Sequence, residues 1–225
     1  MQLHNPDAKI LIVLRDPIDR AVSCYAHLVA NAQLPCVPYE EGLNLLLQGS
    51  KSADWPVGYT VLTHGLYSTG IEIYRQFFDS DQILILDQRR FRSHPEEEME
   101  RVWRFLSLEP HPIEKHLKRS YQSVTYDLAA LGFLNRASQL LSICNQEGVS
   151  LQRRRRLSPW RKRWSNSLRR KARSLPNLRD KPILSSSLNK RLQSYFAPEY
   201  DWLERELQLD FSHPHSISPQ HPPES

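Results

Sequence analysis

The sequence predicts an α/β fold built around a parallel β-sheet. Two short apolar runs, Ile10 to Leu14 and Ile83 to Leu86, have the composition of strands buried inside such a sheet. Segments with helical spacing of apolar residues lie between and after these runs, and each run leads toward the start of a helix. Strands that alternate with helices in this way are typical of layered α/β proteins.

The first unit is a strand, a tight turn and a helix. Because Ile10 to Leu14 is apolar at every position, we expect this strand to be buried on both faces. Asp16 is suited to cap a helix, and Pro17 falls at the first helical position, where its missing N–H costs nothing. Asp19 suits the positive end of the helix. We expect the helix to run from Pro17 to about Asn31.

The middle of the chain predicts a loop-rich excursion and a second strand. Residues 35–58 contain three prolines around a short helical stretch at 40–48. Helical spacing returns over 65–78, and a second buried strand follows at 82–87. Pro95 then opens a helix whose first turn is acidic, which favours the positive helix end.

The last third of the chain changes character twice. A weaker helical pattern at 124–146 gives way to a basic segment punctuated by prolines, and an ordinary helical pattern returns at 188–209. We therefore interpret the chain as one domain with an insertion and a disordered tail rich in Ser, His and Pro. The domain comprises 1–147 and 183–211, the basic insertion 148–182, and the tail 212–225.

The positive charge of the chain is concentrated in the insertion. Residues 153–173 hold eleven Lys or Arg and no Asp or Glu, so the net charge of +5 leaves −6 on the rest of the chain. Ser158 and Pro159 can start a helix there, and apolar residues fall close to one of its faces. These apolar residues are Trp160, Trp164, Leu168, Ala172 and Leu175.

This basic amphipathic helix has four possible roles. It could lie on an anionic membrane surface, grip a sulfated or acidic glycan, or contact nucleic acid. Alternatively its aromatic face packs back on the domain, as apolar helix faces usually do. Among the three binding roles, an anionic surface or a glycan is preferred over nucleic acid.

Cysteine content and hydropathy exclude several classes of protein and of binding site. Cys24, Cys36 and Cys144 are too few and too scattered for a disulfide framework or a four-ligand zinc site, and we expect no metal site. The apolar runs fall far short of the roughly 18 residues that a membrane-spanning helix needs. The first residues lack the pattern of a secretory signal, so we expect a cytoplasmic protein.

The segment Lys9 to Tyr25 resembles the 3'-phosphate-binding motif of sulfotransferases that use 3'-phosphoadenosine 5'-phosphosulfate (PAPS), especially the heparan sulfate branch. In that family a buried strand ends in Leu-Arg-(Asp or Asn)-Pro, and a serine stands eight residues after the arginine; here these are Arg15 and Ser23. The resemblance implies that both bind the 3'-phosphate of the donor. A planar guanidinium can offer paired N–H donors to a dianionic phosphate, and the serine adds a hydroxyl.

Further stretches resemble the family in the same order along the chain. They are His64–Tyr67 with Phe77–Phe78, then Gln82–Leu86, Pro95–Leu108 and Leu192–Leu209. The resemblance implies a P-loop-NTPase-like three-layer fold with a parallel sheet. It also implies transfer of a sulfuryl group from PAPS to a hydroxyl or amine, by family analogy on a carbohydrate, without a metal ion.

Two parts of the family pattern do not occur in the sequence. None of the seven glycines begins a phosphate loop for the 5'-phosphosulfate. The family's usual catalytic base lies between that loop and the arginine motif, so no catalytic residue is assigned, and we interpret the chain as lacking the N-terminal strand and loop. Two alternatives stay open: a non-catalytic fragment or degenerate relative that binds a nucleotide or polyanion, and a nucleic-acid-binding protein that uses the basic insertion.

Overall fold

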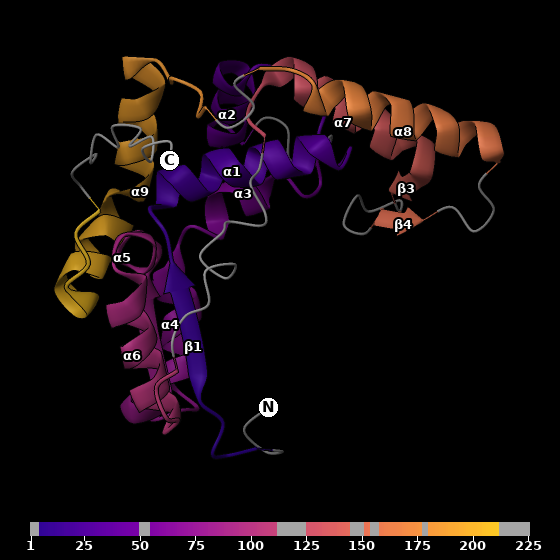
Figure 1. The fold of residues 1–225 in the computed structure, drawn as a ribbon. Coiled ribbons are helices and arrows are strands. Elements are labelled where there is room, and N and C mark those ends of the chain that lie inside the picture. Colours follow the sequence, from indigo (N-terminus) through magenta and orange to yellow (C-terminus); the bar gives the residue numbers. More distant parts are fainter. Residues whose placement is uncertain are drawn as a thin grey trace, which may run out of the picture.

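The computed structural model describes residues 5–49, 55–111, 125–144, 151–153, 158–176 and 180–211. The predicted tail 212–225 lies outside the described residues, as do parts of the basic segment. The helices and strands are placed in Figure 1. In chain order they are β1 (Ile10–Leu14), α1 (Pro17–Ala30), α2 (Tyr39–Leu47), α3 (Tyr59–Thr63), α4 (Tyr67–Arg75), η1 (Ser80–Gln82), β2 (Ile83–Asp87), α5 (Gln88–Ser93), α6 (Pro95–Leu106), α7 (Leu128–Leu141), β3 (Ser142–Cys144), β4 (Leu151–Arg153), α8 (Pro159–Arg173) and α9 (Ser186–Leu207).

The two predicted buried strands pair in parallel. β1 and β2 run in register from Ile10 opposite Ile83 to Leu14 opposite Asp87. Parallel neighbours need a crossover between them, and here the chain crosses over through α1 to α4. The prediction of an α/β fold with a parallel sheet is confirmed, and the carboxyl end of β1 lies beside the start of α1 (Figure 1).

The expectation that β1 is buried on both faces is wrong. Leu11 and Val13 are 41% and 54% exposed, whereas Leu14 is 2% exposed. Successive side chains of a strand point to opposite faces. Leu14 packs with residues of α4 and α9 on one face, whereas α5 and α6 pack against β2. The face of β1 that carries Leu11 and Val13 therefore receives less cover than the strand's composition indicates.

The main core is built around α1. The side chains of Tyr25 and Val29 in this helix are completely buried. Helices α2, α3, α7 and α9 surround α1 and contribute most of the other buried side chains of this cluster. They include Leu43, Val61, Leu131, Leu192 and Phe196. This packing fixes the helix that carries Ser23.

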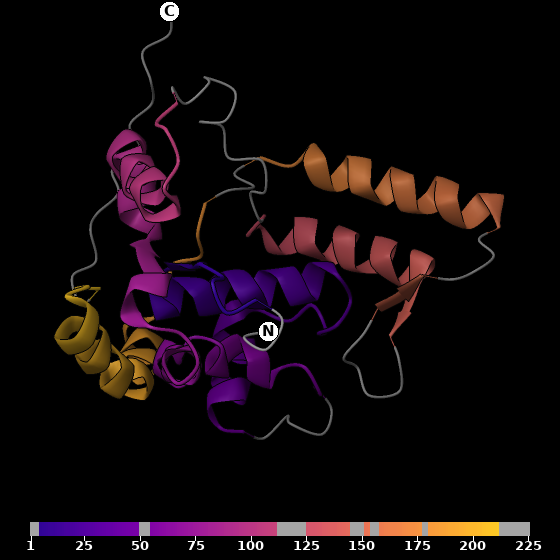
Figure 2. The ribbon, with the colours of Figure 1, turned by 90° about the horizontal axis from the view of Figure 1, so that it is seen from below.

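Helices α7 and α8 lie side by side as a pair that extends away from the parallel sheet (Figures 1 and 2). The interpretation that the aromatic face of α8 packs on the domain is wrong. Ser165 and Ala172 are the side chains of α8 that are buried, at 0% and 2% exposure, whereas Trp160 and Trp164 are more than half exposed. Small side chains at the contact allow the two helix axes to come close, and Ser165 Oγ donates to the Ala137 carbonyl at 3.1 Å.

None of the helices in the described part of the chain combines the length and the apolar character needed to cross a lipid bilayer.

Candidate functional site

The turn between β1 and α1 is held from several directions. Asp16 caps α1, because its Oδ1 accepts a hydrogen bond from the Asp19 N–H at 2.7 Å. The hydroxyl of Tyr200 in α9 donates to Asp16 Oδ2 at 2.9 Å, and the hydroxyl of Tyr67 in α4 donates to the Arg15 carbonyl at 2.9 Å. Burial raises the pKa of the Asp16 carboxyl. The backbone of Arg15 is thus fixed at the carboxyl end of β1.

The side chains of Arg15 and Ser23 meet beside α1. Arg15 Nη1 donates to Ser23 Oγ at 2.8 Å, and Arg15 Nη2 lies 3.6 Å from Asp19 Oδ2. The arginine side chain is 18% exposed, so its guanidinium remains within reach of a ligand. The eight-residue separation in the family motif thus corresponds to an arginine laid along two turns of the helix.

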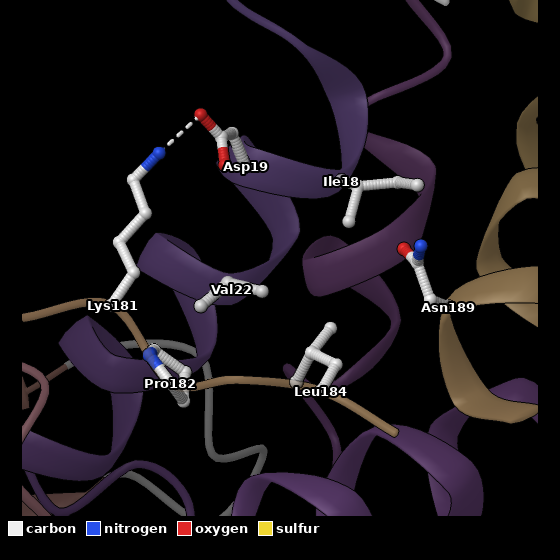
Figure 3. A pocket seen from close by; sticks show the side chains of 7 residues that line it. All are labelled: Ile18, Asp19, Val22, Lys181, Pro182, Leu184 and Asn189. Atoms are coloured by element: carbon white, nitrogen blue, oxygen red, sulfur yellow. Dashed lines mark hydrogen bonds and ion pairs between the residues drawn. The ribbon is translucent and has the colours of Figure 1, made fainter. Parts of the chain in front are cut away.

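Two residues from distant parts of the chain join this pair. The hydroxyl of Tyr126, just before α7, lies 2.6 Å from Ser23 Oγ. Lys181, between α8 and α9, extends toward α1 so that its Nζ lies 2.5 Å from Asp19 Oδ2 (Figure 3). Two cations, Arg15 and Lys181, therefore share one carboxylate, and two hydroxyls lie next to the arginine.

A pocket of about 230 Å³ borders this cluster (Figure 3). It lies between α1, the segment before α9 and the first turns of α9. Its lining is apolar except at Asp19, Lys181 and Asn189. The lining residues are Ile18, Asp19, Val22, Lys181, Pro182, Leu184 and Asn189.

The group formed by Arg15, Ser23, Tyr126, Lys181 and Asp19, called here the Arg15 cluster, has the chemistry of an anion site. Guanidinium, ammonium and hydroxyl groups all donate hydrogen bonds to phosphate oxygens. The carboxylate of Asp19 balances the two cations in the structure. The cluster lies outside the carboxyl end of a parallel strand, where open α/β sheets generally bind ligands.

Comparison with known protein families assigns the chain. The family described as the sulfotransferase domain matches residues 1–176. The chain belongs to the sulfotransferase domain family. A solved sulfotransferase from Alicyclobacillus acidocaldarius has the same fold: the TM-score is 0.53 at 19% identity, over 94% of this chain and 59% of that chain. The prediction of a sulfotransferase-like α/β fold is confirmed.

The curated relatives that match this chain are named as heparan sulfate sulfotransferases. The human bifunctional heparan sulfate N-deacetylase/N-sulfotransferase 2 is 32% identical over 110 residues, which are 47% of this chain and 12% of the relative. The mouse heparan sulfate glucosamine 3-O-sulfotransferase 3B1 is 30% identical over 110 residues, 49% of this chain and 27% of the relative. The chain thus spans only a minor part of these relatives.

The sequence did not predict that Tyr126 and Lys181 join this site. Tyr126 is 103 residues from Ser23, and Lys181 is 162 residues from Asp19. No local spacing connects such positions. The sequence reading also placed Lys181 near the end of the basic insertion, whereas the structure brings it to the start of α1. A basic residue next to Pro182, close to the start of the last helix, was the only local signal.

The residues that could have formed a metal site have separate contacts. Cys36 Sγ lies 3.6 Å from the Leu128 carbonyl, Cys24 lies beside Arg20, and the His27 ring contacts Asn31 at 3.0 Å. Across the described ranges there is no group of three or more His, Cys, Asp and Glu residues with the geometry to hold a metal ion. His64 is exposed, and its pKa is lowered by partial burial and by the charge of Arg20.

Two of the buried carboxylates, Glu98 and Glu199, have hydrogen-bond partners at helices. Glu199 of α9 accepts hydrogen bonds from the N–H and hydroxyl of Ser68, at 2.9 and 2.7 Å, at the start of α4. Glu98 accepts from Arg90 and Arg101 at 2.9 and 2.6 Å. Both carboxylates thus have structural roles as hydrogen-bond acceptors, and no catalytic residue is assigned.

Proposed function

We propose that this chain transfers a sulfuryl group from PAPS to a hydroxyl or amine of a carbohydrate. The observation that carries the proposal is the hydrogen bond between Arg15 and Ser23 at the carboxyl end of β1, in a chain that belongs to the sulfotransferase domain family. These are the two residues that the family resemblance assigns to the 3'-phosphate of the donor.

The Arg15 cluster supplies the groups that a 3'-phosphate needs. Arg15 can present paired N–H donors, and Ser23 can turn its hydroxyl toward a phosphate oxygen. Lys181 adds a second positive charge at the same Asp19 oxygen that Arg15 approaches. A dianionic phosphate attracts both cations more strongly than one carboxylate does, so we propose that it replaces part of their contacts with Asp19.

The proposed reaction is a displacement at sulfur. The acceptor oxygen or nitrogen forms a bond to sulfur, and the bond from sulfur to the 5'-phosphate oxygen breaks. Adenosine 3',5'-bisphosphate leaves with the bonding electrons, and the acceptor loses a proton to a base. The Arg15 cluster holds the nucleotide during this exchange, so its role is binding and orientation.

The acceptor class rests on the relatives. Their names describe transfer to nitrogen in one case and to the 3-oxygen of glucosamine in the other. Both acceptors are positions on the sugar units of an anionic polysaccharide. We therefore propose a polysaccharide acceptor for this chain and leave open which of its atoms receives the sulfuryl group.

The direct test measures transfer. The purified chain is incubated with radiolabelled PAPS and an unsulfated glycosaminoglycan backbone, and label in the polysaccharide is counted. Loss of a charge-assisted hydrogen bond costs about 1.5–3 kcal/mol, so Arg15→Ala should lower donor-limited transfer roughly tenfold to hundredfold.

Arg205→Ala is the matched control, because this arginine is 70% exposed on α9 and lies outside the Arg15 cluster. It should transfer at the wild-type rate. Equal rates for wild type and Arg15→Ala would contradict the assignment of the site. Nucleotide binding without any transfer would contradict the reaction and support the non-catalytic alternative.

A further inference from the structure

Helix α8 presents a continuous cationic surface. Its fifteen residues include seven Lys or Arg and no Asp or Glu. These cations are Arg161, Lys162, Arg163, Arg169, Arg170, Lys171 and Arg173. Neighbouring α7, Leu128–Leu141, contributes Arg136 and no acidic residue. The two helices together form a strongly positive hairpin on a chain whose remaining residues are net negative.

Two tryptophans lie within this cationic surface. Trp160 and Trp164 are 54% and 60% exposed. They are four residues apart and therefore share one side of α8. The Arg161 guanidinium lies 5.2 Å from the centre of the Trp160 ring. A cation thus lies directly beside an exposed indole.

A neighbouring side of α8 packs against α7. Ser165 and Ala172 are buried against α7, and Ser165 Oγ donates to the Ala137 carbonyl. Lys171 Nζ also lies 4.8 Å from the Phe133 ring of α7. The orientation of α8 is therefore fixed by contacts within the chain, and these contacts turn the tryptophans outward.

We propose that the outward face of α8 binds the surface of an anionic lipid bilayer, with Trp160 and Trp164 at the level of the lipid headgroups. An indole combines a large apolar ring with an N–H donor, and it is favoured at the boundary between hydrocarbon and water. Lys and Arg beside it would be attracted to anionic headgroups. A nucleic-acid duplex bound through its phosphates would use the cations alone. Sugar rings and single-stranded bases also stack on indoles, so heparin and an oligonucleotide enter the experiment below as competing ligands.

The charge distribution of the chain favours one orientation on such a surface. The segment 153–173 carries +11, whereas the other residues carry −6. An anionic surface would therefore attract the α8 side of the molecule and repel the rest. Because the hairpin extends away from the sheet (Figures 1 and 2), binding through α8 would leave the Arg15 cluster accessible.

The experiment is cosedimentation of the full chain with vesicles. Mixed phosphatidylcholine and phosphatidylglycerol vesicles should bind the chain, and pure phosphatidylcholine vesicles should bind it much more weakly. Each Lys or Arg near an anionic surface contributes a factor of about five, so Arg163→Glu with Arg170→Glu should weaken binding by about 25-fold or more. Trp160→Ser with Trp164→Ser, which keeps every cation, should weaken binding by about tenfold.

Matched controls change aromatic and cationic side chains outside α8. Tyr59→Ser with Phe77→Ser removes two aromatic side chains that are 57% and 50% exposed outside the hairpin. Lys190→Glu with Arg205→Glu reverses two exposed cations of α9. Both controls and Arg15→Ala should bind anionic vesicles as the wild type does. Circular dichroism before each binding experiment verifies that every variant is folded.

Three results would overturn the proposal. One is absence of binding to anionic vesicles. Another is binding that the tryptophan variant retains in full, which would show attraction by charge alone. The third is preferential binding of heparin or an oligonucleotide with no binding to vesicles, which would assign α8 to a soluble polyanion. A blue shift of tryptophan emission on anionic vesicles, lost in Trp160→Ser with Trp164→Ser, would support it directly.

Discussion

Arg15 is oriented by its own helix and strand before any ligand is present. The guanidinium of Arg15 donates a hydrogen bond to Ser23 and lies near the carboxylate of Asp19. The backbone carbonyl of Arg15 accepts a hydrogen bond from Tyr67. A side chain held in this way loses little rotamer freedom when it binds an anion. The geometry therefore favours a site that is formed in advance rather than one assembled by the ligand.

The first residue-scale prediction concerns Asp16. Burial raises the pKa of its carboxyl above the ordinary value of 3.8. Between 3.8 and the raised value the folded state holds a proton that the unfolded chain releases, so this carboxyl makes the protein less stable as pH rises through that window. Asp16→Asn has no charge to bury. Its free energy of unfolding relative to wild type should therefore increase as pH rises from about 4 upward.

Denaturant unfolding of both proteins at a series of pH values measures this difference. Asp81→Asn is the control, because Asp81 is exposed. Its difference from wild type should not rise over the same window as that of Asp16→Asn does. A difference for Asp16→Asn that stays flat or falls with pH would show that the cap interaction outweighs burial.

The family motif predicts one part of the Arg15 cluster and not the rest. Arg15 and Ser23 lie within one strand-to-helix unit, and the resemblance to the sulfotransferase motif predicts that both bind the 3'-phosphate. Tyr126 and Lys181 reach the cluster only through the packing of α7 and the path of the chain before α9. Such contacts depend on the tertiary fold, and no short pattern in the sequence encodes them.

At the scale of elements, the close contact of α1 and α2 gives a second prediction. A Cβ added to Gly42 of α2 would lie 2.2 Å from the Tyr25 hydroxyl oxygen and 2.4 Å from its ring carbon Cζ. Tyr25 is completely buried, and its hydroxyl donates to the Val37 carbonyl at 2.9 Å, so the ring has little room to move. Gly42→Ala should lower the free energy of unfolding by about 1–3 kcal/mol.

Gly70→Ala is the matched control in another helix. No atom lies within 4 Å of a Cβ added at Gly70 in α4. Alanine is favoured over glycine in a helix by roughly 0.5–1 kcal/mol, so this substitution should stabilise the protein. Thermal or denaturant unfolding of the two variants should give opposite signs. A stabilising Gly42→Ala would contradict the packing of α2 on Tyr25.

Local sequence signals predict most of the helices and strands. They do not predict which side of each element packs against its neighbours. Caps, prolines and apolar spacing predicted α1, α2, α4, α6, α7, α8 and α9, with the two parallel strands. The short helices α3 and α5 were not predicted, because five or six residues carry too little periodicity. The sequence left open which side of α8 packs on the domain, and the alternative in which its aromatic face does so is wrong. Ser165 and Ala172 pack closely on α7, whereas Trp160 and Trp164 are exposed.

At the scale of the whole molecule, charge separates two regions. The Arg15 cluster lies by the carboxyl end of β1, whereas α8, which carries the cations, lies beyond α7 as seen from α1 (Figure 2). A nucleic-acid-binding protein acting through α8 would bind its ligand independently of Arg15. The proposed nucleotide function predicts binding that depends on Arg15 and not on α8. The expectation of a cytoplasmic protein stays a prediction, which fractionation of the expressed chain can test.

The central claim is that Arg15 recognises the 3'-phosphate of the donor nucleotide. Calorimetric titration with adenosine 3',5'-bisphosphate and with adenosine 5'-monophosphate measures this directly, because the two ligands differ only in that phosphate. The wild type should prefer the bisphosphate. Arg15→Ala should reduce the ratio of the two affinities roughly tenfold to hundredfold and leave the monophosphate affinity unchanged. An unchanged ratio in Arg15→Ala would contradict the assignment of the 3'-phosphate site to Arg15.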